Sequence, residues 1–257
     1  MKNSDKAPFF VGYLDMPKQL KRFYIPLVIL VGVLSALGGM SIAKQQQSDG
    51  PAEWQTSSTV TYHGLLKMEP YPVLHRINPD NANETESILL VNQGKFSAEH
   101  YAAPLEDQWV SVTGYPIIRG GWTMLELASD QPIHTAAKIE EPSEFSILGQ
   151  SSSSVSLGAV SFSGEIADSK CFLGVMNPGK GTVHKACAEV CLLGGIPAML
   201  LVLGEDGLKY GYLLTHSDGS SVSKELANQA AKQVEVNGEL VKKGDLLYLQ
   251  IGESEVL

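Results

Sequence analysis

The sequence predicts a mainly β protein, with one N-terminal transmembrane helix followed by two tandem OB-like β-barrels, the second carrying a Cys/His-containing helical insertion. Three observations support this fold class: an uncharged apolar run near the N-terminus, nine short strand-like segments after it, and a glycine pattern that recurs in both halves of that region. Of the 257 residues, 44% are hydrophobic and 18% are charged. This composition can build packed cores and excludes a disordered chain.

The uncharged run lies between Arg22 and Lys44 and predicts a membrane segment at residues 23–44. As a helix it would be about 30 Å long, which matches the hydrocarbon core of a bilayer. A cleaved signal peptide, with its apolar stretch at 25–37, is the alternative interpretation, because a small-residue triplet that suits cleavage follows that stretch.

The charge distribution predicts the orientation of this segment. The first 23 residues carry a net charge of +3, so the rest of the chain carries −12 of the total of −9. By the positive-inside rule, the tail 1–22 lies in the cytoplasm and the main domains lie across the membrane. We therefore expect a single-pass protein of the bacterial inner membrane with its main domains in the periplasm.

Two polar segments divide the rest of the chain: a tether at 45–58 and a Ser-rich linker at 140–156. They bound OB-like β domain 1 at 59–139 and OB-like β domain 2 at 157–257, and the second holds the Cys/His insertion 168–197. The strand-like segments are short, rich in β-branched and aromatic residues, and bounded by Gly, Asp or Pro. They lie at 59–64, 87–92, 109–114, 122–127, 159–164, 198–203, 210–215, 234–238 and 246–251.

A weak internal repeat predicts two barrels rather than one. Each half opens with a strand that ends in glycine, at Gly64 and at Gly164. Each half also has a later strand that ends in glycine, at Gly114 and at Gly238, followed by a short hairpin. Five short strands with a helix or long loop between them are what an OB barrel requires. A single larger β-sandwich is the alternative.

The insertion contains all three cysteines of the chain and one histidine. Their spacing is C-x12-H-x2-C-x3-C, formed by Cys171, His184, Cys187 and Cys191. On a helix at 183–193 the last three would share one face, and Cys171 could complete a tetrahedral Cys3His set, as in structural zinc sites. Soft thiolates also accept Cu(I), so zinc or copper is the expected metal.

Other interpretations of this cluster stay open. An oxidising compartment favours a disulfide among Cys171, Cys187 and Cys191. The same spacing is typical of a buried helix face, and a cysteine near a helix N-terminus can be a nucleophile. Asp168, which precedes the first cysteine, either forms a turn or accepts a hydrogen bond from His184.

Elsewhere the sequence gives weaker signals. A helix start pattern predicts a second helix at 223–233, and His63 and His75, which flank a Pro-rich segment, are expected to be loop residues. No GxSxG, Walker A, HExxH or strand-linked GxGxxG motif occurs, so catalysis is not favoured. The net negative charge argues against binding to nucleic acid.

The run DSKCFLGVMNPGKGTVHKACAEVCLLGGIP at 168–197 resembles a motif of bacterial membrane-anchored periplasmic proteins with OB-like domains, in which DSKC, MxPG and HxxCAxxCxxGGIP follow one another. The resemblance implies an anchored periplasmic protein but no particular activity. The layout is also similar to that of the cytochrome c maturation haem chaperones. Because His63 and His216 lack the HxxxY setting of that family, only the architecture is shared.

The sequence thus predicts a non-catalytic accessory subunit of a bacterial inner-membrane complex with a respiratory or other redox role in electron transport. Its partners would be the membrane and the other subunits of the complex. Small residues four positions apart, such as Gly32 and Ala36, would let a second membrane helix approach closely. The alternative is a metal- or cofactor-handling protein that uses the Cys3His cluster. A thiol-dependent enzyme is the least favoured prediction.

Overall fold

The computed structural model describes residues 16–45, 50–79, 81–128, 132–136, 148 and 153–252. Most of the predicted tail and most of the predicted linker lie outside these residues. The chain divides into two compact units, Met1–Asp49 and Gly50–Leu257. Each unit is described by itself below, and both β-barrels belong to the second.

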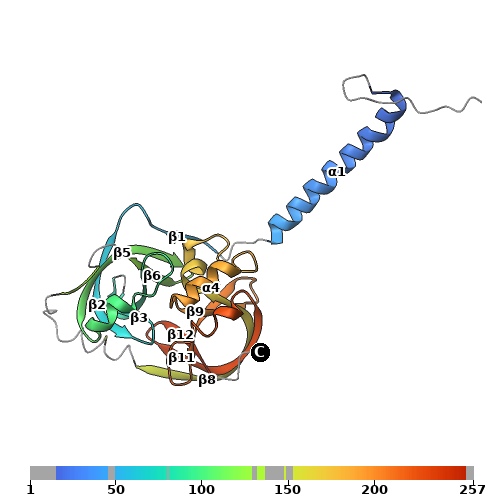
Figure 1. Ribbon diagram of the computed structural model, residues 1–257. Helices are drawn as coiled ribbons and strands as arrows, with labels where there is room; N and C mark the ends of the chain where they lie inside the picture. The colour runs from blue at the N-terminus through green and yellow to red at the C-terminus, as the bar shows by residue number, and fades with distance from the viewer. Residues whose placement is uncertain are drawn as a thin grey trace, which may run out of the picture. The chain divides into compact units, whose positions relative to one another are not determined.

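Helix α1 spans Lys18–Gln45 and contains the predicted apolar segment (Figure 1). Its side chains from Lys21 to Ala43 are all exposed. By length and composition α1 could cross a membrane. A signal sequence near an N-terminus meets the same criterion. Pro26 lies inside the helix, where its missing N–H leaves the carbonyl of Arg22 without an intrahelical donor.

The later strands form a closed barrel in the order β10-β12-β11-β8-β9. Only β10 and β12 run parallel, and the other neighbours are antiparallel. This is the five-stranded barrel that the sequence predicted for the second domain. Its strands are β8 (Ser154–Asp168), β9 (Ala198–Leu203), β10 (Lys209–His216), β11 (Gln233–Lys243) and β12 (Leu246–Ile251).

The earlier strands repeat this arrangement. Strand β5 pairs with both β2 and β6, which closes a ring in the order β5-β2-β3-β4-β6, again with one parallel pair, β4 and β6. Strands β1 (Ala52–Trp54) and β7 (Ile133–Thr135) add to β5 from outside the ring. The ring strands are β2 (Val60–Met68), β3 (Pro72–Asn78), β4 (Asn81–Val91), β5 (Trp109–Arg119) and β6 (Trp122–Leu127).

The pairing registers show that the two barrels are a true structural repeat. Gly114 pairs with Val60 in the first barrel, and Gly238 pairs with Val160 at the equivalent place in the second. A Cβ on either glycine would lie 2.3 Å from a carbonyl oxygen of the next strand. Only glycine permits this approach, so the glycine pattern in the sequence marked real barrel positions.

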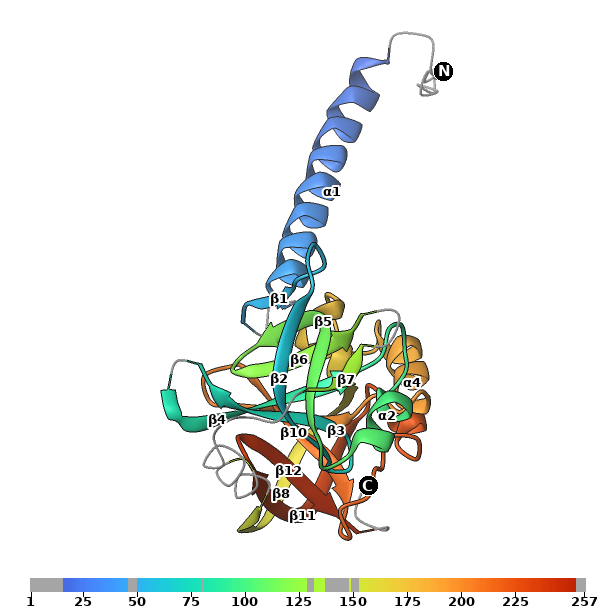
Figure 2. The ribbon, with the colours of Figure 1, turned by 90° about the vertical axis from the view of Figure 1, so that its left-hand side faces the viewer.

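A buried core lies inside each barrel, and a further buried cluster has members from both barrels. Figure 2 shows the strands of the first barrel, such as β2, β5 and β6, above those of the second, such as β8, β11 and β12. The first barrel contributes Leu89 and Met124 to this shared cluster, and the second contributes Leu213 and Tyr248. These are equivalent residues, because the β4–β6 and β10–β12 registers pair them identically. The two repeats therefore pack through the same face, as the subunits of an isologous dimer do.

The prediction of a helix at 223–233 is wrong. That segment forms turns and one short 3-10 helix, η3 (Ala227–Gln229). Ser223 is fully buried, and its Oγ lies 3.0 Å from the Tyr71 hydroxyl and accepts a hydrogen bond from the Ala198 N–H. Ala231 then has a φ of 60°, which a right-handed helix cannot continue through. Tertiary contacts thus override a good local helix signal.

The expectation that His63 and His75 are loop residues is also wrong. His63 lies in strand β2, where it is exposed. His75 differs more from the expectation. It lies in strand β3 and is fully buried. Its Nδ1 is 3.0 Å from the Ser87 Oγ of the neighbouring strand β4. The prolines of the preceding segment hid this strand, because proline usually marks a strand edge or a loop.

Candidate functional site

The Cys/His insertion connects β8 to β9, where the first barrel has only a short turn at 69–71. It begins with a single π-helical turn, η2 (Cys171–Val175), and continues into helix α4 (Lys185–Leu193). Helix α4 buries Ala188, Cys191 and Leu192. This buried face holds the helix against the protein and fixes the direction of its cysteines.

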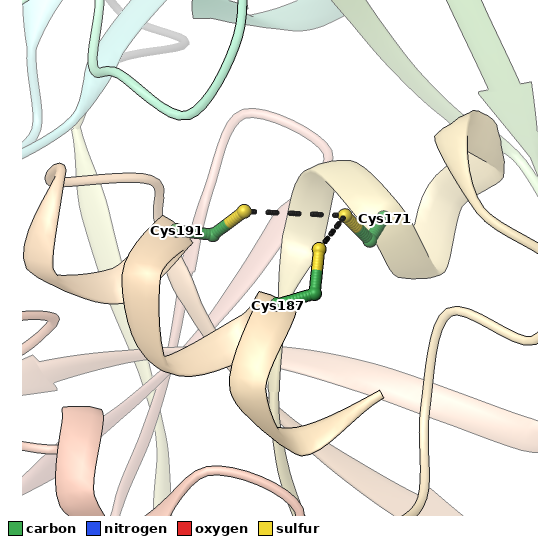
Figure 3. A group of neighbouring side chains, drawn as sticks. All are labelled: Cys171, Cys187 and Cys191. Carbon is green, nitrogen blue, oxygen red and sulfur yellow. Dashed lines mark hydrogen bonds between the residues drawn. The ribbon is translucent and has the colours of Figure 1, made fainter. Parts of the chain in front are cut away.

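The three cysteines converge from these two segments (Figure 3). The Cys171 Sγ lies 4.0 Å from the Sγ of Cys187 and 4.0 Å from the Sγ of Cys191. All three sulfur atoms lie within 4.8 Å of one another, a spacing that could hold a metal ion. Cys187 and Cys191 are four residues apart and so share one face of α4. All three thiols are free, and only Cys187 is not fully buried.

His184, the fourth predicted ligand, bonds elsewhere. Its Nε2 lies 3.0 Å from the Asp168 Oδ2, and the other carboxylate oxygen accepts the Cys171 N–H at 2.9 Å. His184 is the N-cap residue of α4, and its imidazole contacts Asp168 rather than joining the group of three sulfurs. It forms a second group with Asp168 and Cys171, also within 4.8 Å. The four predicted residues thus form two groups that share Cys171.

Lys95 brings the first barrel into the site. Its Nζ donates to the Cys187 Sγ at 2.6 Å and to the Cys191 Sγ at 3.6 Å. It lies in the loop between β4 and the short helix α2 (Glu99–Ala102). An ammonium group beside thiols favours their ionised form, so the first barrel supplies a positive charge at the sulfurs.

The insertion clamps the loop that carries Lys95. The Lys170 ammonium donates to the carbonyls of Asn92 and Gly94 at 2.9 and 2.7 Å and pairs with the Glu126 carboxylate. On the other side, the Ser97 N–H donates to the Gly194 carbonyl at 2.9 Å. Lys170 is only 1% exposed, so this is a buried ion pair between the barrels.

The surroundings shift the pKa values of Cys171 and Cys191 in opposite directions. A hydrogen bond to Cys191, together with burial and the Asp168 charge, raises the pKa of Cys171. The same bond, received from Cys171, lowers the pKa of Cys191, and the Lys95 charge adds to this effect. Partial burial opposes the charge of Lys95, but its contact with Cys187 and the nearby sulfurs raise the pKa of its ammonium group. Relative to the free side chains, the site therefore stabilises the protonated form of Cys171, the ionised form of Cys191 and the ammonium form of Lys95.

Comparison with models of known protein families, with curated proteins and with solved structures finds no match to this chain. The class of site is therefore defined by its own geometry. Three thiols and a lysine ammonium meet between two OB-like barrels, and this cysteine cluster could bind a metal ion.

Proposed function

We propose that the protein is a membrane-anchored metal-binding protein that holds one thiophilic ion at Cys171, Cys187 and Cys191. The supporting observation is the convergence of three sulfur atoms from two segments of the insertion. Metal–sulfur bonds of about 2.3 Å place two sulfurs of a trigonal or tetrahedral site about 3.8–4.0 Å apart. Two of the sulfur–sulfur distances are 4.0 Å, so a metal ion fits with little movement.

The donor set favours copper(I) over zinc. Copper(I) is a soft ion that accepts thiolate ligands, and three sulfurs can surround it without a further ligand. A structural zinc ion takes four ligands, so His184 would have to leave Asp168 to complete its site. Three thiolates around one monovalent ion leave excess negative charge, which the Lys95 ammonium partly offsets.

Elemental analysis of the full-length protein tests this proposal. The protein, in mild detergent without dioxygen, is equilibrated with Cu(I) or Zn²⁺ against a competing chelator. We expect one copper per chain, lost in Cys171→Ser and retained in the matched variant His184→Gln. Loss of metal in His184→Gln instead points to the Cys3His set. Absence of stoichiometric metal in the folded wild type, or its retention in Cys171→Ser, contradicts the proposal.

A second proposed function is that of a non-catalytic accessory subunit of a bacterial inner-membrane redox complex, with a cytoplasmic tail and periplasmic barrels. It is supported by α1, whose apolar side chains find no cover within the described residues. At Gly32 and Gly39 a Cβ would meet nothing within 4 Å, so a second membrane helix could approach there. The resemblance of the 168–197 motif to anchored periplasmic proteins supports the same placement.

Purification of the full chain in mild detergent tests this role. We expect other membrane proteins to co-purify in fixed ratio, and a deletion strain to show slower membrane electron transport. A protein that purifies alone, from a strain whose deletion leaves electron transport unchanged, contradicts the subunit role but not the metal site.

A further inference from the structure

The contact between the Lys95 Nζ and the Cys187 Sγ is shorter than an ordinary hydrogen bond to sulfur. The two atoms are 2.6 Å apart. Ordinary N–H···O bonds are about 2.7–3.2 Å long, and sulfur is a larger atom and a weaker acceptor than oxygen. The same nitrogen lies 3.6 Å from the Cys191 Sγ, which is an ordinary separation. The pair at Cys187 is instead spaced like two atoms joined through one bridging oxygen.

The fold holds both partners in place. Gly94, next to Lys95, is held through its carbonyl by the Lys170 ammonium at 2.7 Å. The backbone of Gly194 packs so tightly on the loop that a Cβ there would lie 1.7 Å from the Lys95 carbonyl oxygen. Lys95 and Cys187 are both only partly buried, so a small oxidant in solution can reach them.

We propose that Lys95 and Cys187 are a covalent modification site, where dioxygen joins the lysine nitrogen to the cysteine sulfur through one oxygen atom. The ammonium first releases a proton to solvent. One N–H bond of the amine, the S–H bond and the dioxygen bond then break, and an N–O and an O–S bond form. The second oxygen atom leaves as water with the two hydrogens. Nitrogen and sulfur each lose two electrons, and dioxygen gains all four.

The competing oxidation product is a disulfide from Cys171 to Cys187 or Cys191. A disulfide bond is about 2.05 Å long, whereas both sulfur pairs are 4.0 Å apart. Each disulfide therefore requires the segments to move together, whereas the Lys95–Cys187 bridge requires no approach. The geometry favours the bridge, which covalently joins the two barrels.

The bridge does not depend on the proposed metal site. If that site exists, however, the two states exclude one another, because the bridge consumes the Cys187 thiolate that a metal ion needs. Oxidation would then release the ion, and reduction would restore the site. This regulatory consequence alone rests on the proposed function.

Mass spectrometry of the full chain tests the bridge. Metal-free protein is purified in detergent without dioxygen, exposed to air and digested without reductant. The exposure is made at mildly alkaline pH, where a larger fraction of lysine side chains is the free amine. We expect a linked pair of peptides that joins Lys95 to Cys187. Its mass should equal the sum of the two peptide masses plus one oxygen atom minus two hydrogen atoms. Dithiothreitol should abolish this product.

The matched control is Lys95→Arg, which keeps a positive charge beside the sulfurs but has no primary amine. It should form no linked peptide while remaining folded. Absence of the linked peptide in air-exposed folded wild type, or a disulfide as the only oxidation product, overturns the proposal. Copper binding is measured separately without dioxygen. A chain that binds copper but never forms the bridge overturns the bridge alone, and the reverse result overturns the metal site alone.

Discussion

The two barrels share their strand order and registers, yet they differ at the connection between their first two strands. In the first barrel this connection is a short turn at 69–71, and in the second it is the insertion that carries every cysteine. The barrels are therefore a common scaffold, and the candidate chemistry lies on a loop added to one of them. This division is typical of folds that host many functions.

The comparison also shows why the site needs both repeats. The insertion supplies the thiols, but the first barrel supplies Lys95 and the loop that Lys170 clamps. Cys171 and Cys191 belong to the shared cluster between the barrels, not to either interior. A change at the contact between the repeats should therefore disturb both the site and the stability of the protein, whereas a change inside one barrel should act on stability alone.

The largest expected effect comes from breaking the ion pair between the repeats. Lys170→Met leaves the Glu126 carboxylate buried without its partner and frees two carbonyls. Removing one member of a buried pair typically costs about 3–5 kcal/mol. Urea unfolding of the full chain in detergent should show a loss of this size.

A second variant separates two effects of Lys170→Met on stability: the unpaired buried charge of Glu126 and the lost packing of the lysine side chain. The second barrel has Gln250 at the position equivalent to Glu126, by the β5–β6 and β11–β12 registers. Adding Glu126→Gln to Lys170→Met should recover more than half of the lost stability, because no buried charge remains. If the double variant is as unstable as the single one, the ion pair is not the stabilising contact.

The next test compares equivalent core positions in the two barrels. Leu125 and Leu249 are fully buried inside the first and second barrel. Each change to alanine should cost about 3 kcal/mol, within the usual range for a buried leucine. Because the repeats share a buried face, both variants should shift one common unfolding transition, monitored by circular dichroism. Two separated transitions would show that the barrels unfold independently.

A smaller effect is expected where the insertion touches the first barrel. Gly194→Ala places a Cβ against the Lys95 carbonyl oxygen and must displace the loop. Overpacking of this kind costs about 1–3 kcal/mol, and it should also reduce the Lys95–Cys187 linked peptide. The control Gly39→Ala, where nothing lies within 4 Å, should leave barrel unfolding and the linked peptide unchanged. Equal effects of the two variants would contradict the assigned contact.

The smallest expected effect is a pH dependence at Asp245, in the hairpin turn of the second barrel that faces the first. Burial raises the pKa of Asp245, although its hydrogen bonds with Ser87 oppose the shift. A carboxyl group with a raised pKa in the folded state contributes stability at low pH, and this contribution is lost as pH rises from about 4 through the folded pKa. The unfolding free energy of wild type, relative to Asp245→Asn, should therefore fall over that window. A rise would contradict the assignment.

Local features in the sequence were enough to predict the barrels and the insertion. At Gly114 and Gly238 the neighbouring backbone comes too close for a side chain, at the same position of each barrel. The same steric constraint therefore placed a glycine in each repeat, and this pattern is visible in the sequence. The helix at 223–233 could not be rejected from sequence, because the contacts of Ser223 with Tyr71 come from the other barrel. Strand β3 was missed for a different reason: prolines at and just before its start are typical of a loop.

The candidate site was predictable only in part. The spacing of Cys187 and Cys191 correctly indicated one helix face, but it could not show that α4 begins after His184. Lys95 lies 92 positions from Cys187 and has no distinguishing sequence context, so the fold alone brings them together. Asp168 was considered as a partner of His184, and the structure places the two in contact.

The central claim is that three sulfur atoms between the barrels bind one thiophilic ion. Copper-edge X-ray absorption of the full-length protein, loaded with Cu(I) in detergent without dioxygen, measures the ligand set directly. We predict one copper per chain with three sulfur neighbours and no nitrogen or oxygen ligand. A copper ion with nitrogen or oxygen ligands, or a folded protein that holds no stoichiometric copper, would contradict the claim.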